Sequence, residues 1–360
     1  MDIKKNRLAF LDFLRFIAAF SVLGEHVFER LFPAFIHFTT HYFQLGLFGV
    51  ILFFLTSGFI IPVSLEKGAS LKTFWVSRIF RLYPLYIVSI ITVLLGIHFG
   101  LYKVSFPSLK TIITNLFMFQ LFLGQPNILG LYWTLCLELF FYFVVSIIFA
   151  LGFIKKSVFI ASVFLGISFV AGVIAIGYFH LASNGWGLIF YLSTMFMGTL
   201  FYRLVNNEIS FSTFIIMIIL AAAVLLSNTF INLYGHDKPE LLGARSFLPV
   251  TTAIIGAYLV FFAVVIRCQK FNFPKVFVFF GVMSYSIYLV QGIILTLIPE
   301  SSNALVFTFT RIGLTISISL VTYHFVEKPF IRFGKKLSES IKNNRDKKLL
   351  AEEKVLSKEF

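Results

Sequence analysis

The chain has 360 residues, of which 59% are hydrophobic and only 13% are charged, and its formal net charge is +14. A soluble domain of this size could not cover its surface with so few polar side chains, so the composition excludes one. The apolar blocks are also too long and too uniform for the alternating strands of a membrane barrel. The composition therefore predicts an all-α, polytopic bundle of membrane helices.

The positive charge is clustered in short loops and in the C-terminal tail, as the orientation of membrane helices demands, so we expect membrane lipids and no nucleic acid as partners. Cys136 and Cys268 lie in or beside apolar segments and indicate neither a disulfide framework nor a metal site. The N-terminus superficially resembles a signal peptide. Asp12 and Arg15 interrupt its apolar core, however, so we interpret it as a retained first span.

Ten apolar segments reach the length of about 20 residues that crosses a bilayer. They are 8–29, 43–65, 78–99, 130–154, 157–178, 185–203, 211–231, 247–266, 276–297 and 303–326. If the shorter run 109–124 does not cross, every later basic loop falls on the same side as the basic N-terminus. We therefore predict cytoplasmic termini and, at 109–124, an interfacial or re-entrant helix on the outer side. A membrane domain at 1–334 would precede a charged cytoplasmic tail at 335–360.

Between residues 8 and 28 the first span carries four ionisable residues, Asp12, Arg15, Glu25 and His26, and such residues rarely face lipid. Asp12 can pair with Arg15 one turn away. Arg15 and His26 return to nearly the same helix face, about 16 Å apart along the axis. This face either lines a reaction path or holds a buried ion pair and a packing histidine. His26 can act as a general base near neutral pH. Glu25 and Glu29 either orient it or are solvated charges.

Two later clusters also carry charge. Arg78 and Arg81 share a helix face, which suits a phosphate-bearing ligand and equally suits simple anchoring on the cytoplasmic side. Glu138 lies in an apolar span near its outer end and requires a partner, for which His26 is the candidate. Trp133 at the start of that span is expected to be an interfacial anchor.

Weaker signals come from three further places. Ser57 and the glycine after it allow close helix approach in the second span. Tyr285 and Tyr288 lie in the penultimate span. His324 and Glu327 end the last span and either close the floor of a cavity or cap the helix. The remaining histidines show no spacing that indicates a metal.

Taken in chain order, these charged and polar segments resemble those of the integral-membrane acyltransferase-3 family, the O-acyltransferases of bacterial surface glycans. Five segments carry the resemblance, from residue 8 to residue 330: LDFLRFIAAFSVLGEH, FFLTSGF, SRIFRLYP, YWTLCLELFFY and YHFVEKP. Two positions depart from the family pattern. Thr134 replaces a serine, and Gln291, which cannot take a proton, stands where the family often has a histidine.

The resemblance implies a ten-helix bundle in the bacterial cytoplasmic membrane. It implies an acyl-CoA donor, usually acetyl-CoA, and a glycan or glycolipid hydroxyl as the acceptor. His26 then corresponds to the essential histidine, which would act as the general base or carry the acyl group itself. Arg15 corresponds to the arginine of the same helix and Glu138 to the carboxylate of the tryptophan-containing segment. Arg78 and Arg81 correspond to the pair that binds the coenzyme. No metal is implied.

Two other functional classes stay open from the residues alone. Buried Arg, Glu and His also mark proton-coupled transporters and flippases, which would move a glycan or lipid intermediate without making a bond. Inverted hydropathy symmetry between the halves would favour a carrier, and we see none. A non-catalytic scaffold would not need charges on an internal helix face.

Overall fold

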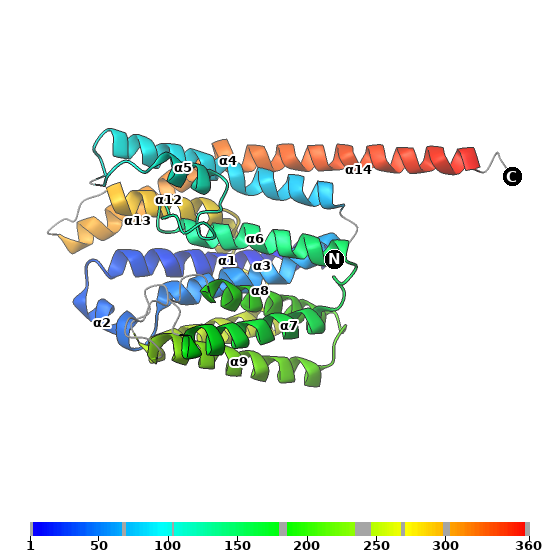
Figure 1. The fold of residues 1–360 in the computed structure, drawn as a ribbon. Coiled ribbons are helices and arrows are strands. Elements are labelled where there is room, and N and C mark those ends of the chain that lie inside the picture. Colours follow the sequence, from blue (N-terminus) through cyan, green and yellow to red (C-terminus); the bar gives the residue numbers. More distant parts are fainter. Residues whose placement is uncertain are drawn as a thin grey trace.

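The computed structural model describes residues 3–66, 70–102, 104–179, 186–234, 246–267, 271–297 and 303–356. Within these ranges the chain forms helices joined by turns and loops, without a strand (Figure 1). The predicted all-α bundle is therefore confirmed. Cys268, Lys67 and Lys270 lie outside the described residues, as do His180 and His236.

The helices follow one another with short connections. They are α1 (Ile3–Phe28), α2 (Pro33–His41), α3 (Leu45–Glu66), α4 (Leu71–His98), α5 (Leu109–Leu116), α6 (Tyr132–Ala150), α7 (Ser157–Val170), α8 (Trp186–Val205), α9 (Phe211–Tyr234), α10 (Phe247–Phe262), α11 (Lys275–Val282), α12 (Ser284–Leu297), α13 (Ala304–Thr322) and α14 (Lys328–Leu356). Three π-helical turns, η1 (Ala171–Tyr178), η2 (Ala263–Arg267) and η3 (Tyr323–Glu327), extend α7, α10 and α13. Polar side chains cap the N-termini of several helices. Ser70 and Ser108, for example, accept a backbone N–H three residues later.

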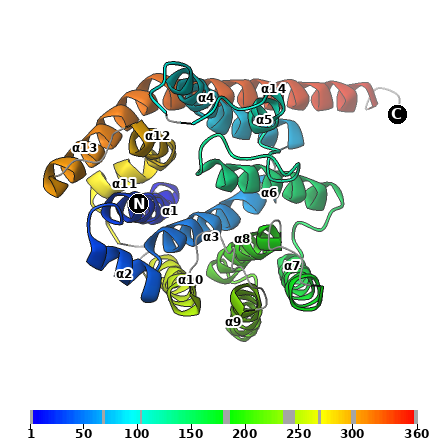
Figure 2. The same cartoon turned by 60° about the vertical axis from the view of Figure 1, so that its left-hand side comes forward.

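Eight helices in the described ranges are long and apolar enough to cross a membrane. The pair α11 and α12, bent by 66°, makes a ninth if it is one span. Helix α1 is not one of these eight candidate spans, because Asp12, Arg15 and Glu25 interrupt its apolar stretch. Nevertheless α1 lies beside α3 within the bundle (Figures 1 and 2). With α1 included, the set corresponds segment by segment to the ten predicted spans.

The centre of the bundle is formed by α1 and α3, with α7, α8 and α9 on one side and α4, α12, α13 and α14 on the other (Figure 2). Backbone contact joins α3 to α8. A Cβ at Gly58 would lie 1.6 Å from the carbonyl oxygen of Met195, and one at Gly198 would lie 2.2 Å from that of Leu55. Glycine is required at both positions. This confirms the close helix approach predicted for the second span.

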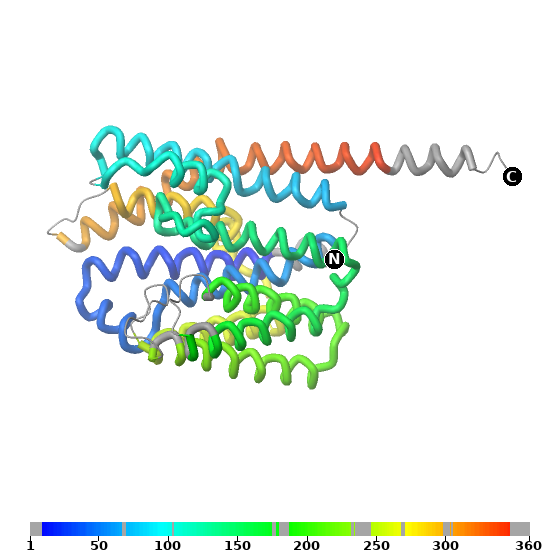
Figure 3. The backbone as a smooth tube through the Cα atoms, in the orientation of Figure 1, coloured from blue at the N-terminus to red at the C-terminus, as the bar shows by residue number. Residues whose placement is uncertain are grey.

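The segment 109–124 does not cross. Its helix α5 has eight residues, about 12 Å, and the chain then turns back into the bundle to begin α6 (Figure 3). The turn is held by Asn115, which is fully buried. Its side-chain nitrogen donates to the carbonyls of Thr111 and Pro126, and its side-chain oxygen accepts the N–H of Ile128. As a result α6 begins partway along the bundle, not at its edge (Figure 1).

The C-terminal helix α14 runs without a break through residue 335, where the tail is predicted to begin, and extends beyond the bundle (Figure 1). Its first half packs along α4. The ring of Phe80 lies 6.5 Å from that of Phe330 and 5.1 Å from that of Phe333, centroid to centroid. The start of α1 and the end of α14 lie at the same end of the bundle, which we call the termini end, and the opposite end is the far end.

Candidate active site

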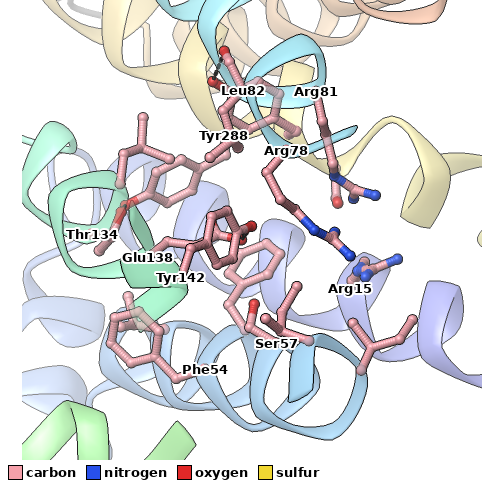
Figure 4. Close-up of a pocket in the computed structure, with 17 residues that line it drawn as sticks. Arg15, Phe54, Ser57, Arg78, Arg81, Leu82, Thr134, Glu138, Tyr142 and Tyr288 are labelled. Atoms are coloured by element: carbon pink, nitrogen blue, oxygen red, sulfur yellow. Dashed lines mark hydrogen bonds between the residues drawn. The ribbon is translucent and has the colours of Figure 1, made fainter. Parts of the chain in front are cut away.

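A cavity with about 710 Å³ of empty space, its open mouth included, lies between α1, α3, α4, α6 and α12. Its charged lining consists of Arg15, Arg78, Arg81 and Glu138, so we call it the arginine chamber (Figure 4). Three guanidinium groups against one carboxylate give the lining a formal charge of +2. The chamber therefore suits an anionic ligand.

The three arginines are held to different degrees. Arg15 donates to Asp12 at 3.1 Å, which confirms the pair predicted within the first span. The guanidinium of Arg78 lies over the rings of Phe74 and Tyr142 and donates weakly to Ser64, at 3.4 Å. Its Nε is buried and has no hydrogen-bond partner among the described residues.

Arg81 forms no ion pair within 4.0 Å among the described side chains, although Glu138 and Glu327 act on it electrostatically. Figure 4 shows its guanidinium group above those of Arg78 and Arg15, at the same side of the chamber. Donor capacity at Arg78 and Arg81 is therefore free for a ligand, whereas Arg15 is already paired.

Glu138 faces the arginines. Its Oε1 accepts a hydrogen bond from the hydroxyl of Tyr142 at 2.5 Å, and its charge acts on Arg15, Arg78 and Arg81. The predicted pairing of Glu138 with His26 is therefore wrong. The prediction assumed that α6 begins at the far end of the bundle. Because α6 begins partway along the bundle, Glu138 lies nearer the termini end than it would in a full span.

Two tyrosines of α12 brace the chamber wall. The hydroxyl of Tyr285 donates to the carbonyl of Leu82 on α4 at 2.7 Å, and that of Tyr288 lies 2.7 Å from the hydroxyl of Thr134 on α6. The ring of Tyr288 also meets that of Phe53 edge-on, 5.8 Å between centroids. These contacts join α12 to α4, α6 and α3 around the chamber.

His26 lies on α1 toward the far end, about 16 Å from Arg15 along the helix axis. Its side chain is partly buried, and it is not among the described residues that line the chamber. The rings of Phe53 and Tyr288, which contact each other, form one wall of the chamber. The structure thus brings Arg15, Arg78, Arg81 and Glu138 together and places His26 beyond them.

The other predicted residues divide between the chamber and its surroundings. Ser57 lines the chamber, and Trp133 packs behind it against Phe54 and Tyr191 inside the bundle rather than as a surface anchor. Glu327 is buried and accepts from the hydroxyl of Ser286 at 2.6 Å. His324 is exposed, and its Nδ1 lies 2.9 Å from the carbonyl of Leu320, so it does not join the chamber.

The structure shows the surroundings of two further residues, Tyr142 and Gln291, that the sequence could not predict. Tyr142 is fully buried and joins Glu138 to Arg78, and the only signal was its position one turn after Glu138. Gln291 is fully buried on α12, and neither atom of its amide has a partner among the described residues. Ile287 and Leu295, one turn to either side of it, pack on α1. Among the described residues no group of three or more His, Cys, Asp or Glu side chains could hold a metal ion.

Comparison with known proteins gives a consistent picture. A family model described as an acyltransferase domain, that of acyltransferase family 3, matches residues 8–324. The acyltransferase MdmB of Streptomyces mycarofaciens is 31% identical over 150 residues, which is 38% of this chain and 38% of MdmB. ORF330 of Acidianus two-tailed virus, whose name assigns acetyltransferase activity provisionally, is 27% identical over 293 residues, 76% of this chain and 79% of ORF330. No solved structure matches.

Proposed function

Since the chain belongs to the acyltransferase-3 family, a family of membrane acyltransferases, we propose that it moves an acyl group from acyl-CoA to a hydroxyl of a cell-surface or lipid-linked glycan. The observation that carries this proposal is the convergence of three arginines on one chamber inside a membrane bundle. The name of ORF330 supports acetyl as the group transferred.

Coenzyme A is a strong candidate for the chamber because its phosphates are anionic. Guanidinium groups bind phosphate through two parallel hydrogen bonds, and Arg78 and Arg81 have donors free for them. Arg15 and Glu138 would then contact the arm that follows the phosphates. Burial strengthens such contacts, because water competes poorly within the bundle.

The distribution of basic residues supports a donor site on the cytoplasmic side. The chamber arginines lie in the half of α1 and of α4 nearer the termini end, and Lys155, Lys156 and Arg203 lie near this end as well. An excess of positive charge marks the cytoplasmic side of membrane proteins. We therefore assign the termini end to the cytoplasm and the far end to the outside, in a bacterial cytoplasmic membrane.

The chemistry falls to His26 in this proposal. The thioester would pass the wall of Phe53 and Tyr288 and meet the acceptor at the far end. His26 takes the hydroxyl proton while the acceptor oxygen attacks the thioester carbonyl carbon. The carbon–sulfur bond then breaks, and the leaving thiolate receives the proton from the imidazolium. The products are an ester and free coenzyme A.

The test is incubation of purified protein, in lipid nanodiscs, with acetyl-CoA labelled in the acetyl group. Release of free thiol together with movement of label to an added glycan, or to water, supports the enzyme. A transporter would bind and move glycan without releasing thiol. Absence of thiol release with every glycan acceptor tested, while coenzyme A still binds, would contradict the proposal.

A further inference from the structure

One contact at the far end of α1 involves the residue directly before His26. Glu25 is buried, with 6% of its surface exposed, and its Oε2 accepts the backbone N–H of Gly46 at 2.6 Å. We propose that Glu25 is a positioning residue for His26, and that its contact with α3 fixes the turn of α1 that presents the imidazole. This inference rests on the proposed function, because it takes His26 as the reacting base.

The contact is well matched in charge. The first N–H groups of a helix have no partner within the helix and carry a partial positive charge. The carboxylate of Glu25 takes the N–H of Gly46 and also a backbone hydrogen bond from Leu45, so it covers the first turn of α3. The sequence left open whether Glu25 is a solvated charge, and its burial excludes that reading.

A side chain at the position opposite Glu25 would displace the carboxylate. A Cβ built on Gly46 would lie 2.4 Å from Oε1 of Glu25 and 3.0 Å from its Cδ. One turn further along α3, a Cβ on Gly49 would lie 2.5 Å from the carbonyl oxygen of Ala18. The contact of Glu25 therefore continues a stretch in which α1 and α3 meet backbone to backbone.

The same turn is tied to two other elements. Glu29 accepts from the hydroxyl of Thr39 on α2 at 2.6 Å, and Arg30 donates to the carbonyl of Leu295 on α12 at 3.2 Å. His26 lies between these tethers and makes no hydrogen bond to any described residue. Three tethers thus hold the turn while the imidazole is left for a ligand.

The sharpest perturbation is Gly46→Ala. The new methyl group meets the flexible end of Glu25, so the helices keep their packing and the carboxylate must leave the N-terminus of α3. Displacement of a reacting group by about 1 Å costs about 10²-fold in rate. We therefore expect Gly46→Ala and Glu25→Ala each to lower the turnover of acetyl-CoA by about 10- to 100-fold, without weakening coenzyme A binding in the distant chamber.

Glu25→Gln separates position from charge. Glutamine keeps an oxygen that accepts the N–H of Gly46, in a bond about half as strong as that of the carboxylate. We expect it to recover about tenfold of the activity that Glu25→Ala loses. The matched control is Gly24→Ala, on the same turn, whose new Cβ would meet only ordinary contacts at 3.7 and 3.8 Å. Wild-type turnover is expected there.

A readout at His26 itself tests the mechanism. Diethyl pyrocarbonate modifies accessible imidazoles, and peptide mass spectrometry resolves His26 from the other six histidines of the chain. We expect its modification rate to change in Gly46→Ala and Glu25→Ala and not in Gly24→Ala. A double variant Gly46→Ala/Glu25→Ala should be no worse than either single variant, because both break one contact.

The outcomes are decisive in each direction. Wild-type turnover in both Gly46→Ala and Glu25→Ala overturns the inference. So does a loss of coenzyme A affinity and of thermal stability in parallel with turnover, since that pattern shows general destabilisation. The proposed function fails separately, if His26→Ala retains turnover. If only His26→Ala is inactive, His26 remains the general base and the positioning role of Glu25 is refuted.

Discussion

Arg81 offers the cleanest test of donor binding, because it has no carboxylate within ion-pair distance among the described residues. Removing Arg15 would leave Asp12 without its ion-pair partner. Arg81→Ala removes a hydrogen-bond donor and breaks no ion pair among the described residues. A hydrogen bond to a charged group contributes about 1.5–3 kcal/mol, and about 1.4 kcal/mol corresponds to tenfold in affinity. We therefore expect Arg81→Ala to weaken coenzyme A binding by about 10- to 100-fold.

The assay is calorimetric titration of free coenzyme A, which involves no chemical step. Arg81→Lys should retain part of the affinity, because lysine keeps the charge but not the fork of two parallel donors. Lys156→Ala is the charge-matched control: this exposed lysine near the termini end does not line the chamber, so affinity should be unchanged. Equal affinity of Arg81→Ala and the wild type would refute a phosphate-binding role for this residue.

Three further predictions follow from the contacts. His26→Ala should lower acyl transfer by about 10² to 10⁴-fold with normal thermal unfolding, measured by thiol release; near-normal transfer would contradict the base assignment. Tyr142→Phe removes the donor to Glu138, so we expect unfolding in detergent to become easier by about 1–3 kcal/mol, and an unchanged stability would show that water replaces the hydroxyl. Gly58→Ala sets a Cβ 1.6 Å from the backbone oxygen of Met195, so the melting temperature should fall by several degrees or the protein should fail to accumulate. A normal melting curve would mean that α3 and α8 can separate at little cost.

The sequence predicts well those features that depend on a single helix. The spans follow from apolar length, and the pair of Asp12 and Arg15 follows from their spacing of one turn. The shared face of Arg78 and Arg81 follows from a spacing of three residues, and both line the chamber.

Depth along the bundle was harder to predict, because it depends on where each helix begins in space. The chain between α4 and α6 turns back into the bundle, so Glu138 lies with the arginines and not with His26. No periodicity in the sequence reports such a displacement. The buried contact of Glu25 with Gly46 depends on α1 and α3 meeting at one height, which is likewise a tertiary property.

The packing of Phe80 has a practical consequence for work with shortened chains. Phe80 lies between Arg78 and Arg81 in sequence, and its ring packs on Phe330 and Phe333 of the protruding helix α14. A truncation at the end of α13 would remove Phe330 and Phe333, expose the ring of Phe80 and weaken the packing of the part of α4 that carries Arg78 and Arg81. One that removes only residues beyond 345 leaves this support in place, so purification tags belong after that point.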